Sequence, residues 1–152
     1  MICLLLGYSL LFTVVKPNVP KARVIIRDTR FMLTELATFV NLCEHHQDND
    51  VAVKLRGDMA KLVEATDTVA ANIRLMMKKT FLRELHEILT GMQITIELML
   101  NRLFYVQKPT TKTEYFTAYT EKVRKLVMDL IKKVEQRQAT NTPGNRNLEW
   151  DG

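Results

Sequence analysis

Two adjacent histidines, His45 and His46, have the clearest capacity for chemistry in this chain, because Glu44, Asp48 and Asp50 surround them. Imidazole and carboxylate groups are metal ligands, and a structural zinc site takes four ligands in a closed tetrahedron. Neighbouring helical residues point about 100° apart, so the pair cannot readily hold one ion from a regular helix. The chain supplies no second half of such a site. We therefore expect an ordinary polar helix end, with no metal bound.

Other enzymatic patterns are equally incomplete. His86 is flanked by Glu84 and Glu87, but Arg83 occupies the position that the Glu-x-x-His motif of di-iron bundles gives to glutamate. Ser9 is the only serine, which excludes a serine hydrolase, and the chain has no Gly-rich phosphate loop. The sequence thus predicts a non-enzymatic protein with no catalytic residue and no cofactor.

The two cysteines do not suggest a disulfide scaffold, which would need more of them at close spacings. Cys3 belongs to an apolar run, and Cys43 falls on an apolar helical stripe. Burial among apolar side chains raises the pKa of a thiol and makes it a poor nucleophile. We expect Cys43 to be a small buried hydrophobic residue.

Residues 122–134 combine an apolar side with a basic side. A helix of this kind can lie on anionic lipid or enter the groove of a partner protein. The same pattern also suits the fourth helix of any bundle. We take its cations as the candidate contacts for a protein partner or a lipid surface: Lys122, Arg124, Lys125, Lys132 and Lys133.

These residues are positioned by four segments in which apolar side chains recur at alternating steps of three and four. This spacing places them on one stripe of an α-helix, and the stripe must find apolar partners. Four stripes can cover one another, which predicts an all-α, antiparallel, up-down-up-down four-helix bundle. The stripes contain Ile25, Met32, Leu36, Phe39 and Cys43; Leu55, Met59, Leu62, Val69, Ile73 and Met76; Leu85, Ile88, Met92, Ile96, Met99 and Leu103; and Phe116, Tyr119, Val123, Leu126, Leu130 and Val134.

Cap and breaker residues place the ends of the helices. We expect the first helix over residues 21–46 and the second over residues 51–78, with Asp50 as its N-cap. The stripe changes phase near Lys78, which indicates a break and a third helix capped by Thr80 that ends near residue 106. The alternative is one bent helix across both segments. A fourth helix follows the capping box of residues 111–114 and ends near residue 136.

Three segments follow from this pattern: an apolar segment over residues 1–16, the bundle over residues 21–137, and a flexible polar tail over residues 138–152. Residues 1–15 carry no charge but are short for a membrane span, which needs about 20 residues. They lack the basic start of a usual signal peptide. Three interpretations stay open: a signal or anchor segment, an extra core element, or the remnant of a longer gene product. The protein is membrane-associated or secreted in the first case, and cytoplasmic otherwise.

The net charge of +5 at pH 7 does not indicate nucleic-acid binding, because basic and acidic residues are interspersed. The aromatic side chains fall mostly on or beside the core stripes, so we expect few of them to be available for stacking on bases; they are Phe31, Phe39, Phe81, Phe104, Tyr115, Phe116 and Tyr119. The leading prediction is a non-enzymatic interaction module, an adaptor or scaffold that binds a protein partner. The alternative is a membrane-associated or membrane-perturbing bundle that uses residues 1–15 and the basic fourth helix on anionic lipid.

Overall fold

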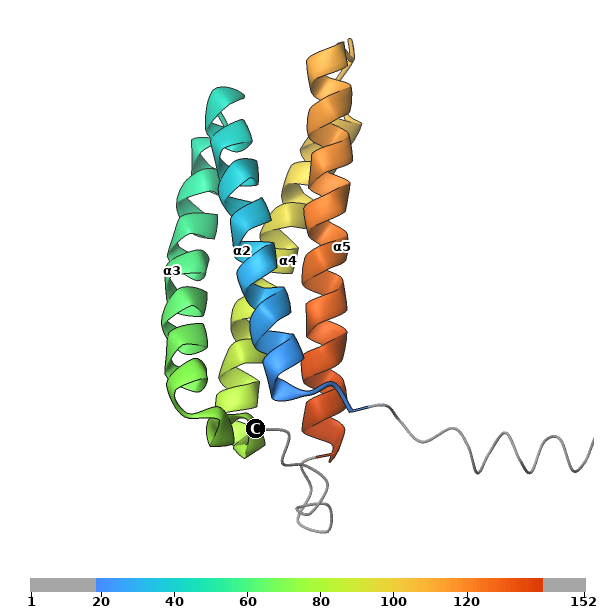
Figure 1. Ribbon diagram of the computed structural model, residues 1–152. Helices are drawn as coiled ribbons and strands as arrows, with labels where there is room; N and C mark the ends of the chain where they lie inside the picture. The colour runs from blue at the N-terminus through green and yellow to red at the C-terminus, as the bar shows by residue number, and fades with distance from the viewer. Residues whose placement is uncertain (1–18, 141–152) are drawn as a thin grey trace, which may run out of the picture.

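The computed structural model describes residues 19–140, which form an antiparallel four-helix bundle (Figure 1). The elements are α2 (Ala22–His45), α3 (Asn49–Ala71), the 3-10 helix η1 (Ile73–Met77), α4 (Lys79–Phe104) and α5 (Thr111–Thr140). Successive helices alternate in direction, and each packs against two neighbours, so that α5 returns to lie beside α2. The predicted up-down-up-down fold is confirmed. The predicted apolar segment over residues 1–16, and residues 141–152 of the predicted tail, lie outside the described residues.

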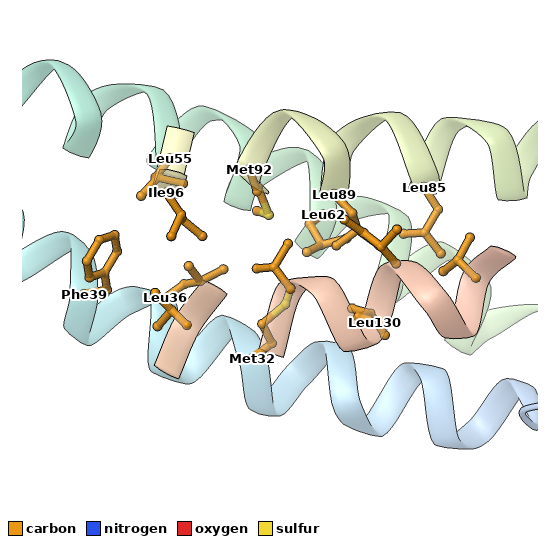
Figure 2. Close-up of a cluster of buried hydrophobic side chains, with 14 of the residues drawn as sticks. Met32, Leu36, Phe39, Leu55, Leu62, Leu85, Leu89, Met92, Ile96 and Leu130 are labelled. Atoms are coloured by element: carbon orange, nitrogen blue, oxygen red, sulfur yellow. The ribbon is translucent and has the colours of Figure 1, made fainter. Parts of the chain in front are cut away.

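One apolar seam runs through the centre of the bundle. Side chains from all four helices point into it, among them Leu36 of α2, Leu62 of α3, Ile96 of α4 and Leu130 of α5, each no more than 1% exposed (Figure 2). The remaining stripe positions are partly buried and pack against this core; they are Met59, Ile73, Ile88, Leu103, Tyr119 and Leu126. The apolar spacing therefore located the core correctly.

The connection between α3 and α4 differs from the prediction. Helix α3 ends at Ala71, and Asn72 leaves the helical conformation with φ −141° and ψ 89°. The 3-10 helix η1 follows, and Lys78 is extended before α4 begins, so the alternative of one bent helix is wrong. The break predicted near Lys78 exists, but an earlier one at Asn72 escaped prediction. Lys78 rather than Thr80 is the N-cap of α4.

Three further boundaries move by a few residues. The N-cap of α3 is Asp48 and not Asp50. The hydroxyl of Thr110, one position before the predicted capping box, accepts a 3.2 Å hydrogen bond from the backbone N–H of Thr113. Helix α5 continues to Thr140, about one turn beyond the end predicted near residue 136.

A buried arginine explains why α5 runs so far. Arg137 is 1% exposed, and it continues the α5 stripe three residues after Val134. Its Nε donates a 3.2 Å hydrogen bond to the carbonyl oxygen of Met76, and its Nη1 donates a 3.0 Å hydrogen bond to the carbonyl oxygen of Pro20. Backbone carbonyls near the end of one helix or before the start of the next lack a helical partner and need such donors. Arg137 thereby fastens η1 and the entry to α2 to the last turns of α5.

We predict that Arg137→Met lowers the free energy of unfolding by about 2–4 kcal/mol, because it leaves the buried carbonyl oxygen of Met76 and the partly buried one of Pro20 without this donor. Urea denaturation measures the change. The matched control is Arg83→Met, which makes the same substitution at an exposed site of α4 and should change stability by less than about 0.5 kcal/mol. An unchanged or increased stability of Arg137→Met would show that the cost of burying the guanidinium outweighs its hydrogen bonds.

Candidate interaction surfaces

Three of the five predicted contact cations lie between helices and form ion pairs there. Lys122 pairs with Glu35 of α2 at 3.2 Å, and Lys133 pairs with Asp28 of α2 at 2.5 Å. Arg124 reaches across to α4, where it pairs with Glu97 at 3.4 Å. In the structure these cations join α5 to both of its neighbours.

The pair of Lys122 and Glu35 belongs to a small polar cluster that includes Tyr119. The Tyr119 hydroxyl donates a hydrogen bond to Glu35, and the ammonium group of Lys122 lies 5.3 Å from the centre of the Tyr119 ring. Hydrogen bonds from Tyr119 and then Lys122 lower the pKa of Glu35. The Glu35 carboxylate therefore stays ionised and accepts from both Tyr119 and Lys122.

The other two predicted contacts, Lys125 and Lys132, are exposed on the outer face of α5. Neither forms an ion pair with another residue of the described part of the chain. They border a shallow hollow together with Arg124, Met128 and Asp129. Of the predicted set, these two lysines point away from the bundle.

A groove of about 260 Å³ opens at the end of the bundle where the α2–α3 turn meets the α4–α5 turn. We call it the end groove. Phe116 is fully buried at its base, and the His46 ring stacks on Phe116 with centroids 4.5 Å apart and an angle of 17°. His46 thus serves as a packing residue. The groove is lined by His46, Asp48, Met99, Arg102, Leu103, Val106, Thr113 and Phe116.

An ion-pair cluster closes one side of the end groove. Arg102 of α4 donates to both carboxylate oxygens of Asp50, at 3.0 and 2.5 Å, and approaches Asp48 at 3.4 Å. The hydrogen bonds from Arg102 lower the pKa of Asp50 to about 2. This cluster joins the start of α3 to the end of α4. Asp50 therefore binds an arginine 52 residues away instead of capping its own helix.

Exposed apolar side chains gather next to the end groove. Of the nine large apolar side chains exposed in the described residues, five lie between residues 94 and 106. Ile94 and Leu98 lie on one outward line of α4, and Tyr105, seven residues after Leu98, is the C-cap of this helix. The ring centroids of Phe104 and Tyr105 are 5.4 Å apart. Val106 also lines the groove. We call this set the apolar patch: Ile94, Leu98, Phe104, Tyr105 and Val106.

The apolar patch corrects one sequence expectation. We expected Phe31, Phe104 and Tyr115 on or beside the core stripes, but they are 53%, 80% and 56% exposed. An indication of this is present in the sequence, because Ile94 and Leu98 do not fit the third stripe. Apolar residues off the stripe of an amphipathic helix face solvent or a partner.

Cys43 and the histidines supply no reactive centre. Cys43 is fully buried, as predicted, and burial raises the pKa of its thiol to about 12. Within residues 19–140, no three His, Cys, Asp or Glu side chains are grouped closely enough to hold a metal ion. No helix in that range has the length and apolarity that a membrane crossing requires. Comparison with protein-family models, curated proteins and solved structures finds no match for this chain.

We predict that the Asp50 carboxyl titrates near pH 2, and that Arg102→Gln moves its pKa upward to its ordinary value of about 4. Because the pKa is lowered on folding, the stabilisation by Asp50 is complete above the unfolded value and is lost as the pH falls toward 2. Carboxyl carbon NMR across pH 1.5–6 measures both values. A wild-type midpoint near 4 would show that the pair does not form in solution.

We predict that the Cys43 thiol reacts with iodoacetamide at least 100-fold more slowly in the native protein than in urea, because the reagent needs an accessible thiolate. A Cys3→Ser variant leaves Cys43 as the only thiol. Mass spectrometry of timed samples at pH 8 gives both rates. Equal rates would mean that this part of α2 opens readily.

Proposed function

We propose that the protein is a non-enzymatic interaction module, an adaptor or scaffold that binds a protein partner through the end groove and the apolar patch. The exposure of Phe104 at 80% and of Tyr105 at 73% is the observation that carries this proposal. Two adjacent aromatic side chains left in water at the end of a well-packed bundle contribute little to the fold. Contiguous exposed apolar surface of this kind is characteristic of protein–protein contact sites.

The chemistry of this end matches that of contact hot spots. Binding hot spots are enriched in aromatic residues and arginine, set beside pockets that exclude water. Phe104 and Tyr105 provide the anchors, and the end groove, which Arg102 helps to line, provides the pocket. Full burial of one such aromatic side chain against a partner contributes about 1.5–3 kcal/mol. Several together are enough for a specific contact.

The charges near the apolar patch favour a different protein over a second copy of this chain. Lys108 and Lys112 lie around the α4–α5 turn and are exposed, whereas Arg102 is paired with Asp50 and Asp48. A symmetric contact would bring this surface against itself and place like charges together, which is unfavourable. The partner we propose has an apolar surface with an acidic rim.

The predicted contacts on α5 have a different place in this proposal. Lys122, Arg124 and Lys133 are engaged in ion pairs within the bundle, whereas Lys125 and Lys132 are available at its outer face. The alternative function, association of α5 with anionic lipid, therefore rests on Lys125 and Lys132. Among residues 19–140, no comparable apolar patch accompanies these two lysines, which is why we favour the end of the bundle.

We predict that a photo-crosslinking amino acid at Tyr105 captures one discrete protein in the native cells, and that the same group at Lys61 on the outer face of α3 does not. The added change Phe104→Ser should reduce the yield at least fivefold, because it removes an anchor without disturbing the core. Mass spectrometry identifies the adduct. Equal capture at both positions would contradict the proposal, and an adduct of two copies of this chain would replace the heterologous partner with a dimer.

A further inference from the structure

A second feature lies at the other end of the bundle, where α2 begins and α3 passes into η1. It is an open cleft of about 520 Å³ between the two elements. Arg23, Arg27 and Arg30 of α2 line one wall. The small residues Ala70 and Ala71 face them from α3, with Ile73 of η1. We call this the arginine cleft.

The spacing of the three arginines suits an extended anion. Arg23, Arg27 and Arg30 stand at positions i, i+4 and i+7, which lie on one face of a helix. They extend along about 10 Å of the helix axis, at 1.5 Å per residue. Guanidinium groups bind phosphate through paired hydrogen bonds, which makes arginine the preferred residue for this group. The small side chains of Ala70 and Ala71 on the opposite wall leave room for an anion of about this length.

Arg27 and Arg30 keep most of their positive charge toward the cleft. Its lining includes no acidic side chain from the described part of the chain. Asp28 lies at its margin and pairs with Arg27 at 3.2 Å, but the Arg27 side chain is 74% exposed, so this pair is weak. Asp28 also binds Lys133 at 2.5 Å, which offsets its negative charge.

The chain itself indicates the source of the anion. Residues 1–15 are uncharged and mostly apolar, and the chain that follows them in sequence enters α2 at the end that carries the arginine cleft. Lys16 and Lys21 add two cations to this connection. A cluster of basic residues directly after an apolar segment is the pattern that attracts anionic phospholipids, at about 1 kcal/mol for each cation near the surface.

We propose that the arginine cleft binds the phosphate groups of an anionic phospholipid headgroup. The arginines hold the phosphate oxygens, and Ile26 and Ile73 provide an apolar floor for the adjoining part of the lipid. This site is independent of the partner surface at the opposite end of the bundle, so the two proposals can fail separately.

The test compares two variants of the full chain that lose the same charge. Arg27→Gln with Arg30→Gln removes two cations from the cleft, and Lys125→Gln with Lys132→Gln removes two from the outer face of α5. Binding is measured by cosedimentation with phosphatidylcholine vesicles, with and without one tenth phosphatidylinositol bisphosphate. The ratio of the two affinities isolates the headgroup contribution from any contribution of residues 1–15.

We expect the wild type to prefer the anionic vesicles, the cleft variant to lose at least tenfold in that preference, and the α5 variant to lose less than twofold. Equal losses in both variants would indicate attraction by net charge, or a contribution of the outer face of α5 as large as that of the cleft, and either would overturn the proposal. An unchanged preference in the cleft variant would overturn it as well.

A competition experiment with a soluble phosphate compound distinguishes a lipid headgroup from other sources of phosphate. Inositol hexakisphosphate should displace the wild type from the anionic vesicles, because it presents the same phosphate groups. Binding of this compound or of a phosphorylated peptide, with no preference of the protein for anionic vesicles, would assign the cleft to a soluble ligand and overturn the lipid proposal.

Discussion

The structure depends on the mutual burial of four apolar stripes, none of which can leave water alone. The seam formed by side chains such as Leu36, Leu62, Ile96 and Leu130 sets the direction and neighbours of every helix. Removing apolar surface from water is the dominant favourable term in folding. Once the inner faces are used in this way, binding is left to outer faces and ends. The two surfaces to which we assign binding lie at opposite ends of the seam.

The sequence was sufficient to predict the fold because stripe spacing is a local property. It was insufficient for the helix ends, which depend on groups far apart in the chain. Helix α3 stops at Ala71, and η1 is held by Arg137, which donates to the carbonyl of Met76 from 61 residues away. The stripe of α5 does pass through Arg137, but a charged residue at a core position reads as the end of a stripe. Only the location of its carbonyl partners shows that it belongs inside.

The candidate sites were predictable in part, for the same reason. The sequence identified the cations of α5, but it could not show that Lys122 and Lys133 meet Glu35 and Asp28 on a helix about a hundred residues earlier. The arginines of the cleft were visible as a spacing on α2, whereas the alanines opposite them come from the end of α3. The apolar patch escapes prediction because the spacing of aromatic residues near a stripe does not show which of them the bundle leaves exposed.

The central claim is that the fold is complete without the apolar patch, which leaves that surface available for a partner. The direct test is the free energy of unfolding of the double variant Phe104→Ser, Tyr105→Ser, from urea denaturation of the full chain. Our account predicts a value within about 0.5 kcal/mol of the wild type, as for other exposed substitutions. A loss of more than about 2 kcal/mol, which is typical of truncating a buried side chain, would contradict it and make these aromatic residues part of the core.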